Sequence, residues 1–396
     1  MTLTALVAAY EGADGGLSAT LPLAGVTLVE HQIRRLKVAG AERIVLLLEQ
    51  WPPALATPLA RLRADGIVVE PVTSLADAAD RLAGASRVLL VADGCLPDQD
   101  LVDRVAAAAV PSFATLPDGP DREDYERIDA ATRWAGLALI DGRRIAETAA
   151  MLGEWDPVST MLRRIVQEGA ARIEAGAEPP MIARSPAVLA AAEARLIAGS
   201  RGAARSWADR WIHRPIAEAA LPYLFAWGAE PLWLGAAAVL LAFAGGIVAI
   251  EGWRWPALLL LLPAGPIAAT GLRLGAVQAR TLGWALPLLQ GRRAGLLLAA
   301  IGLGGSLAVD GRQWGWLLLA VLLLGLMTAL GIQRRILAWM GGGDEAPWLA
   351  AADALPWAMV PFAIAGAWGT GLAALGLYAL ASLAAVTRRL ARIAAA

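Results

Sequence analysis

Residues 232–250 read LWLGAAAVLLAFAGGIVAI, an apolar run without a single charged residue. A helix needs about 20 predominantly apolar residues to cross the hydrocarbon core of a bilayer, which is roughly 30 Å thick. The run is therefore long enough to form a membrane-spanning helix. It places the second half of the chain in the class of membrane proteins.

Comparable apolar runs follow along the chain, and six spans are the simplest count. The further runs cover residues 255–272, 294–309, 314–332, 347–365 and 368–386. Cytoplasmic loops of membrane proteins are enriched in Arg and Lys. With the first half of the chain inside, the cytoplasmic loops carry most of the arginines of this region: Arg273, Arg280, Arg292, Arg293, Arg334, Arg335, Arg388, Arg389 and Arg392. We therefore expect a bacterial-type inner (cytoplasmic) membrane protein with six spans and both termini in the cytoplasm.

Charge is unevenly distributed along the chain. The whole sequence is 58% hydrophobic and 17% charged, but most charged residues precede about residue 215, which indicates two domains of different solvent class. The net charge of −1 and the absence of a basic tract with interleaved aromatic residues exclude a broadly basic nucleic-acid binder. The single Cys95 excludes an internal disulfide framework. His31 and His213 lie far apart in the sequence, so no histidine metal cluster is expected.

Short apolar runs alternate with helical patterns in the first half of the chain. Residues 3–9, 43–48 and 87–92 are strand-like, and residues 26–39 are helical. This rhythm predicts a mostly parallel, Rossmann-like sheet covered by helices. Residues 1–10 lack a charged n-region, so they read as the first strand rather than a signal peptide. The N-terminal domain is expected to stay in the cytoplasm.

Two candidate ligand sites follow strands of this predicted sheet, because ligands bind at the carboxyl ends of parallel strands. The first is the segment YEGADGGL at residues 10–17, in which Gly12, Gly15 and Gly16 let backbone N–H groups approach a phosphate. The second is Asp93 at the end of VLLVADG, a candidate for a nucleotide or Mg²⁺. The alternative for Asp93 is an aspartate that caps the next turn.

The order of these pieces resembles the nucleotidyltransferase family that joins a nucleoside triphosphate to a sugar or polyol phosphate. The resemblance covers about residues 1–198 and rests on LPLAGVTLVEHQIRRLKVAGAERIVLL, VLLVADG, WAGLALIDG and SPAVLAAAEARL. It implies that Asp93 holds Mg²⁺. The chain departs from the family where residues 10–22 contain neither arginine nor lysine. It departs again at residues 182–186, IARSP, where a pattern resembling D-V-D-T-P has its second metal aspartate replaced by alanine or arginine. Arg184 is a candidate phosphate partner or a solvated arginine before a helix.

Residues 207–227 mix arginines and His213 with large apolar side chains. They predict an interfacial helix on the cytoplasmic leaflet, with a plain linker helix as the alternative and His213 as a surface residue beside lipid headgroups. With the Arg214-Pro215 step and the predicted spans, this layout resembles the CDP-alcohol phosphotransferase family. The two-domain order is similar to bifunctional enzymes that make a CDP-polyol and then transfer its phosphoryl group.

The metal-binding pattern of that second family, D-x2-D-G-x2-A-R-x8-G-x3-D-x3-D, lacks its aspartates here. Anchored on Arg273, the four aspartate positions fall on Gly265, Ala268, Leu286 and Gln290. No acidic residue occurs between Glu251 and Asp310, so shifting the alignment does not supply one. The resemblance therefore implies no metal-dependent phosphotransfer at the usual site.

The cytoplasmic ends of predicted spans two and three are cationic instead. Arg273, Arg280, Arg292 and Arg293 are candidates for binding an anionic lipid headgroup or a nucleotide, and the alternative is that they only fix orientation. Asp353 lies inside the fifth predicted span and is an intramembrane functional candidate. Its alternative is a hydrated residue near the interface. Glycine-rich stretches at 302–305 and 366–371 permit close helix contacts, either within or between chains.

Three parts are therefore predicted: a cytoplasmic nucleotidyltransferase-like α/β domain at 1–198, an interfacial linker at 199–230 and an all-α, six-span domain at 231–396. Parallel loss of ligands in both halves favours a non-catalytic binding or assembly subunit in phospholipid or polyol-phosphate metabolism. Its expected partners are membrane lipids, a nucleotide or anionic headgroup, and another membrane protein. The alternative is an active transferase of phosphorus-containing groups that uses Asp93, with Mg²⁺ as its only cofactor, and the membrane-face arginines. No catalytic residue is assigned.

Overall fold

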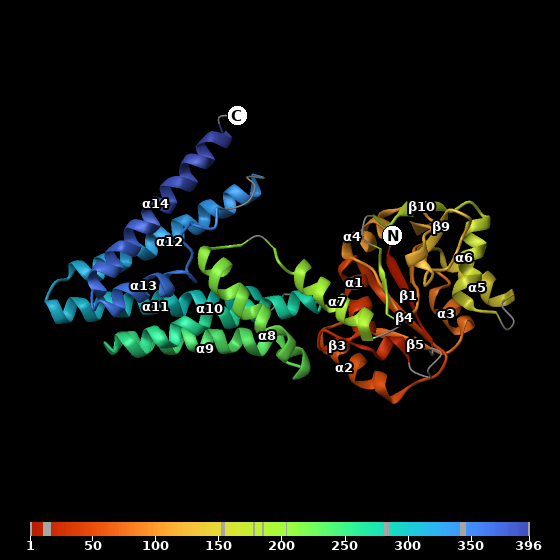
Figure 1. Ribbon diagram of the computed structural model, residues 1–396, viewed down its shortest axis with the longest axis horizontal. Coiled ribbons are helices and arrows are strands. Elements are labelled where there is room, and N and C mark those ends of the chain that lie inside the picture. Colours follow the sequence, from red (N-terminus) through yellow and green to blue (C-terminus); the bar gives the residue numbers. More distant parts are fainter. Residues whose placement is uncertain are drawn as a thin grey trace. The chain divides into compact units, whose positions relative to one another are not determined.

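The computed structural model describes residues 2–10, 17–151, 155–176, 179–183, 186–202, 204–280, 283, 285–340 and 346–394 (Figure 1). Its contacts divide the chain into two compact units. The α/β unit comprises Met1–Leu196 and Gln278–Thr281, and the helical unit comprises Ile197–Val277 and Leu282–Ala396.

A seven-stranded sheet forms the centre of the α/β unit, with the strand order β10-β8-β9-β6-β1-β4-β5 (Figure 1). The strands are β1 (Leu3–Ala9), β4 (Ala41–Leu48), β5 (Val69–Val72), β6 (Val88–Val91), β8 (Ser112–Pro117), β9 (Thr132–Ile140) and β10 (Ala171–Glu174). β1 is parallel to both β4 and β6, whereas β9 is antiparallel to its neighbours β6 and β8. The unit is thus a mixed, Rossmann-like α/β sheet.

The strands predicted from apolar runs are confirmed as β1, β4 and β6. The predicted helix at 26–39 is α1 (Leu28–Val38), but its first two residues form β3 (Val26–Thr27), which pairs with β2 (Pro22–Leu23). Thr27 and Glu30 form a capping box at the start of α1, which explains why the helix begins after Thr27.

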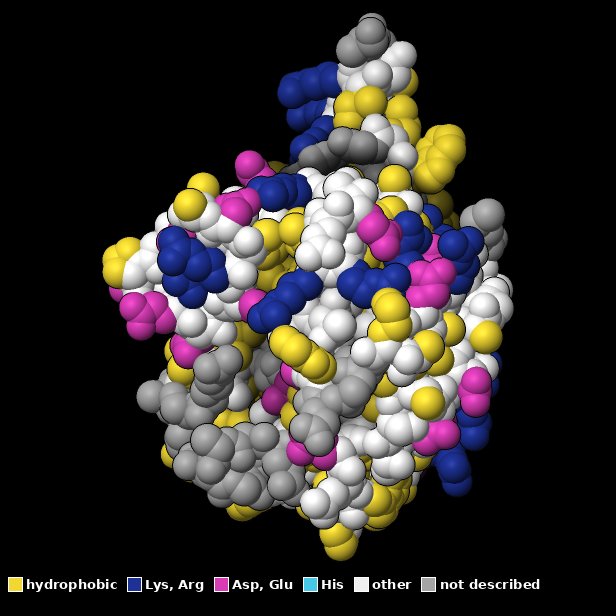
Figure 2. Space-filling view, turned by 90° about the vertical axis from the view of Figure 1, so that its right-hand side faces the viewer, with side chains coloured by type: hydrophobic (Ala, Val, Ile, Leu, Met, Phe, Trp, Pro, Cys, Tyr) yellow, Lys and Arg dark blue, Asp and Glu magenta, His cyan; other side chains and the backbone are white. Residues whose placement is uncertain are grey.

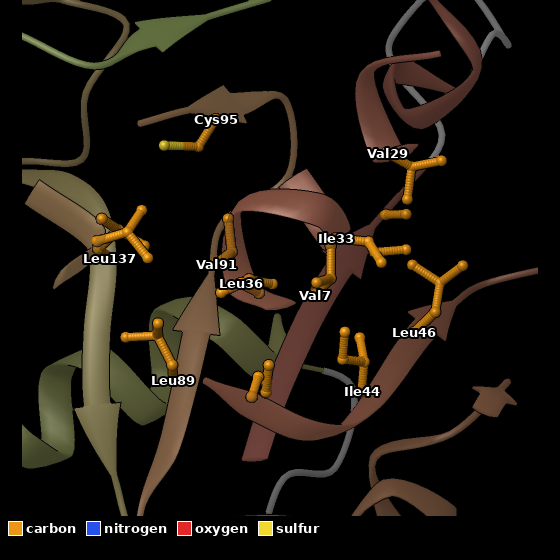
Figure 3. Close-up of a cluster of buried hydrophobic side chains, with 14 of the residues drawn as sticks. Val7, Val29, Ile33, Leu36, Ile44, Leu46, Leu89, Val91, Cys95 and Leu137 are labelled. Carbon is orange, nitrogen blue, oxygen red and sulfur yellow. The ribbon is translucent and has the colours of Figure 1, made fainter. Parts of the chain in front are cut away.

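Helices pack on both faces of the sheet. One core contains side chains from α1, α2 (Ala56–Ala64) and α4 (Gln99–Ala107), and the other contains side chains from α3 (Leu75–Leu82), α5 (Gly142–Met151) and α6 (Pro157–Gln167). Val7 of β1 packs with Ile33 of α1 in the first core (Figure 3). Because side chains alternate along a strand, the neighbouring Leu6 belongs to the second core. Strands buried on both faces read as continuous apolar runs, which is why the sequence revealed them.

Charged side chains of both signs are interspersed on the face of the molecule shown in Figure 2. The α/β unit contains surface ion pairs such as Arg43–Glu70, with N–O 2.7 Å, and Arg104–Asp100, with N–O 2.9 Å. Exposed pairs of this kind contribute at most about 1 kcal/mol each. The two apolar cores, rather than these pairs, therefore hold the unit together.

Helix α1 buries polar side chains as well as apolar ones. His31 is fully buried, and its Nε2 lies 3.1 Å from the carbonyl oxygen of Leu23. Because a carbonyl can only accept, Nε2 carries the proton and donates it. Burial, followed by the positive charge of Arg35, lowers the pKa of His31 to about 3. The imidazole is therefore neutral in the folded protein at neutral pH.

His31 is expected to make the α/β unit less stable in acid. Between pH 6.5 and about 3 the unfolded chain binds a proton at His31 that the folded chain does not, so stability decreases as pH falls below 6.5. The expected loss is about 1.4 kcal/mol per pH unit. Hydrogen exchange of β1 and β4 peptides in the full chain, corrected for intrinsic rates, measures this slope. His31→Gln, which keeps a donor but does not titrate, should flatten it; an unchanged slope would contradict the assignment.

Among the described residues of the helical unit, five helices are long and apolar enough to cross a membrane, and these suggest a membrane protein. They are α9 (Pro231–Ile250), α10 (Arg254–Val277), α11 (Ala285–Gly311), α12 (Gly315–Trp339) and α14 (Trp368–Ala394). A π-helical turn, η4 (Asp209–His213), continues into α8 (Arg214–Ala226) ahead of them. Further elements of the chain are α7 (Pro186–Gly199), β7 (Cys95–Leu96), β11 (Met181–Ile182), η1 (Ser18–Thr20), η2 (Pro53–Leu55) and η3 (Pro120–Arg122).

The fifth predicted span, at 347–365, is wrong as a spanning helix. Only α13 (Leu355–Ile364) forms there, and its 10 residues extend about 15 Å, half of a bilayer core. Residues 346–354 form turns and irregular backbone, and Pro356 occupies the first turn of α13. Proline is favoured in the first turn of a helix, so Pro356 in the middle of the apolar run fits a helix that begins only at Leu355.

Glycines bring α9 and α11 into backbone contact within this chain. A Cβ atom added at Gly295 would lie 2.6 Å from the carbonyl carbon of Ala242, and one at Gly302 would lie 2.6 Å from the nitrogen of Ile250. Gly305 has no neighbour within 4 Å of such an atom. Small residues allow helices to approach this closely. The close contact involves the face of α11 that carries Gly295 and Gly302, and not the position of Gly305.

Candidate functional site

Asp93 lies two residues after the end of β6, at the edge where the carboxyl ends of β6 and β1 meet. Ser18 Oγ donates a hydrogen bond of 2.9 Å to Asp93 Oδ2. Strand β11 returns to the same edge and pairs with β7, so that the backbone N–H of Ala183 donates to Gly94 O at 2.8 Å. The structure therefore brings residues 182–183 next to the turn at Asp93 and Gly94.

Acidic side chains surround Tyr10 at the carboxyl edge of the sheet. Burial, then the negative charges of Asp156, Asp93 and Glu49, raise the pKa of Tyr10, which directly follows β1. The Tyr10 hydroxyl is buried, and no described residue forms a hydrogen bond with it. Sequence analysis did not single it out as a site residue. Its environment favours a neutral hydroxyl and disfavours a polyanion such as a triphosphate.

A protein-held metal does not fit the residues described at this edge. Across the described ranges, no group of three or more His, Cys, Asp or Glu side chains could hold a metal ion. The carboxylate of Asp93 and the hydroxyl of Ser18 would need substrate phosphates to complete the coordination of Mg²⁺. The other predicted phosphate ligands, Gly12, Gly15, Gly16 and Arg184, lie outside the described residues.

The helical unit contains a cavity of about 590 Å³, here called the arginine cavity. Its walls come from the first half of α11, the last half of α12 and the non-helical segment before α13. Five arginines line it: Arg205, Arg292, Arg293, Arg334 and Arg335. Asp353 is the one acidic side chain among the described lining residues. The cavity therefore has an excess of positive charge.

Most of these arginines have no carboxylate partner. Within the described part of the chain, Arg205, Arg292, Arg293 and Arg335 form no ion pair, and Nε of Arg292 is buried without a hydrogen-bond partner. Arg334 donates from Nη1 to Ala350 O at 3.2 Å and from Nη2 to Arg205 O at 3.1 Å. Arg334 thus anchors the cavity wall, and the other four guanidinium groups are left for a ligand.

Asp353 lies in the irregular segment before α13, so its predicted position inside a spanning helix is wrong. Its Oδ2 is 3.5 Å from Ser206 Oγ and 3.6 Å from Nδ1 of His213.

The predicted surface position of His213 is wrong. Its side chain is only 1% exposed, and a Cβ atom added at Gly265 would lie 2.7 Å from its Nε2. Burial lowers the pKa of His213 despite the negative charges of Asp353 and Asp209. Because Gly265 has no side chain, the imidazole can pack directly against α10 at this position.

The four arginines predicted to form one anion site are only partly brought together. Arg292 and Arg293 line the arginine cavity, but Arg273 Nη1 pairs with Glu218 at 3.3 Å, and Arg280 belongs to the α/β unit, 3.8 Å from Asp65. Sequence analysis missed Arg205, Arg334 and Arg335 as site residues. The sequence feature that could have revealed Arg334 and Arg335 is the repeated Arg-Arg pair at 292–293 and 334–335, since each pair adjoins an apolar run.

Comparison with known proteins yields no family. No family model matches the chain, and no curated protein sequence matches it. Among solved structures it is similar to a CMP:2-keto-3-deoxy-manno-octonic acid synthetase complexed with CTP, with 12% sequence identity and a TM-score of 0.38. The match covers 50% of this chain and 100% of that one.

Proposed function

We propose that this chain is a membrane-embedded protein that binds a phosphate-bearing ligand in the arginine cavity. The observation that carries the proposal is a cavity of about 590 Å³ lined by four arginines that form no ion pair within the described residues. Positive charges that converge in a partly buried site repel one another unless an anion joins them.

Arginine chemistry favours phosphate as that anion. The planar guanidinium group presents several N–H donors in a fork that matches two phosphate oxygens, and it stays charged at any physiological pH. Arg292 and Arg293 lie about two turns from the start of α11, in the first part of a candidate span. Such a position suits either the headgroup of an anionic lipid or a soluble phosphate ester.

Binding without catalysis is the role that we propose. The aspartate positions implied by the CDP-alcohol phosphotransferase resemblance hold Gly265, Ala268, Leu286 and Gln290, and the imidazole of His213 occupies the space beside Gly265. Phosphoryl transfer needs cations that neutralise developing charge and clamp the reacting oxygens. A ligand-binding or assembly subunit in phospholipid or polyol-phosphate metabolism fits this set of residues.

The proposal is tested by titrating the full chain in an uncharged detergent with two phosphomonoesters. Glycerol 3-phosphate represents a soluble ligand, and dioctanoyl phosphatidic acid represents a lipid; native mass spectrometry counts the bound molecules. We expect saturable binding of one molecule per chain for at least one of them. Equal retention of an uncharged diacylglycerol, or no saturable binding of either phosphate, would overturn the proposal.

The second candidate function is nucleotidyl transfer at Asp93. It is favoured by the meeting of Asp93, Ser18 and residues 182–183 at the carboxyl edge of the sheet. If it holds, the purified chain should transfer CMP from CTP to a polyol phosphate in the presence of Mg²⁺, and Asp93→Asn should abolish the transfer. Absence of any transfer by the unaltered chain would remove this candidate.

A further inference from the structure

A second cavity lies in the helical unit, and its walls are apolar. It has a volume of about 90 Å³, and helices α10, α11, α13 and α14 contribute most of its lining. Representative lining residues are Leu258, Ala299, Leu303, Met359 and Trp368. Its one charged lining residue, Arg254, pairs with Asp310 and with Ser306 Oγ at 3.2 Å. We call it the apolar cavity.

The two cavities follow one another along the same helices. On α11 the arginine cavity is lined from Leu289 to Leu297 and the apolar cavity from Leu296 to Leu303. At 1.5 Å per residue, Arg293 and Ala300 are separated by roughly 10 Å along the helix axis.

The order is the same along α12. There, Leu323 lines the apolar cavity, and the stretch from Met327 to Ala338 lines the arginine cavity. Ala352, in the segment before α13, lines both. A polar cavity near the helix ends therefore borders an apolar one deeper along the candidate spans.

We infer that the ligand is a phosphorylated amphiphile, with its phosphate in the arginine cavity and a segment of one hydrocarbon chain in the apolar cavity. This inference rests on the proposed function and names the class of its ligand. The order of the cavities matches the order of headgroup and chain in a membrane lipid. An engineered apolar cavity of about 150 Å³ accepts benzene. The smaller volume here fits a few methylene groups of a narrow, flexible chain rather than a ring.

The lining of the apolar cavity favours a hydrocarbon group over a polar one. Its described lining offers no free charge, since Arg254 is paired, and a polar group placed there would lose its hydrogen bonds with water. Each methylene group that leaves water is expected to strengthen binding about fourfold. Phosphatidic acid should consequently bind more tightly than glycerol 3-phosphate, which has the same phosphomonoester without chains.

The test compares three forms of the full chain: the unaltered protein, Ala299→Leu, which fills the apolar cavity, and Ala294→Leu, which makes the same change at an exposed position of the same helix. Affinities for dioctanoyl phosphatidic acid and glycerol 3-phosphate are measured for each by native mass spectrometry. Ala299→Leu should lose at least tenfold in affinity for the lipid and keep its affinity for glycerol 3-phosphate. Ala294→Leu should bind both as the unaltered chain does.

Failure of this inference and failure of the proposed function give different results. If Ala299→Leu binds the lipid as tightly as the unaltered chain, the hydrocarbon site is overturned and the phosphate site stands. If the unaltered chain binds neither probe, the proposed function falls as well. Should Ala299→Leu fail to fold, dibutanoyl phosphatidic acid serves as the second measurement on the unaltered chain: binding at least tenfold weaker than that of the dioctanoyl form supports the inference, and equal binding overturns it.

Discussion

Replacement of both Arg292 and Arg293 by alanine is expected to weaken the binding of a phosphate-bearing ligand at least a hundredfold. Both side chains line the arginine cavity, and neither forms an ion pair within the described residues. A hydrogen bond to a charged group contributes about 1.5–3 kcal/mol, so loss of one from each arginine removes about 3–6 kcal/mol. A hundredfold change in affinity corresponds to about 2.7 kcal/mol.

The control for this variant is Arg388→Ala, which removes an exposed arginine of α14 that lies outside the cavity. Binding of glycerol 3-phosphate or dioctanoyl phosphatidic acid, whichever the unaltered chain binds, is measured for all three proteins at constant salt, because screening affects every exposed arginine. Equal losses in the control and in the double variant would indicate general attraction by positive charge. They would contradict a specific site.

Gly302→Leu is expected to disrupt the helical unit. Its new Cβ would meet the backbone nitrogen of Ile250 at 2.6 Å, a separation that real Cβ atoms essentially never show, and the rest of the side chain would need still more room. Helices α9 and α11 would have to move apart, because the obstacle is backbone and no rotamer change relieves it. Overpacking of a well-packed core costs about 1–3 kcal/mol, and a change from Gly to Leu at a backbone contact should reach the upper end.

Gly305→Leu is the matched control, since nothing lies within 4 Å of a Cβ added there. Thermal unfolding of both full-length variants in the same detergent is the measurement. The midpoint should fall strongly for Gly302→Leu and stay close to that of the unaltered chain for Gly305→Leu. Similar midpoints for the two variants would show that α9 and α11 do not pack as described.

The sheet could be predicted from sequence because its central strands are apolar on both faces. β1, β4 and β6 appear as short apolar runs for that reason, and their parallel pairing follows from the helices between them. The burial of the polar side chains of helix α1 could not be predicted from the sequence. Glu30, His31 and Arg34 are each at most 1% exposed, whereas polar residues of this kind normally mark a solvent face. Glu30 is stabilised by Arg61 and Arg34, partners that a one-dimensional pattern does not reveal.

Hydropathy predicted the five long helices found among the described residues of the second half, and one span that does not form a long helix. The run at 347–365 is apolar enough, yet only Leu355–Ile364 is helical, with Pro356 in its first turn, where proline is tolerated. The same local break places Asp353 in irregular backbone at the wall of the arginine cavity.

The arginine cavity could not be predicted from the sequence, because its arginines come from three separate segments. Arg205 precedes α8, whereas Arg334 and Arg335 lie near the end of α12. Topological reasoning explained each arginine separately as a cytoplasmic charge. Only the packing of the helices places them around one space.

A cryo-electron microscopy structure of the full chain in nanodiscs containing phosphatidic acid tests the central claim most directly. The account predicts density for a phosphate group in the arginine cavity, in contact with Arg292 or Arg293, and density for a hydrocarbon chain that runs toward Ala299. A cavity that contains only water, with its arginines paired to carboxylates of the protein itself, would contradict it.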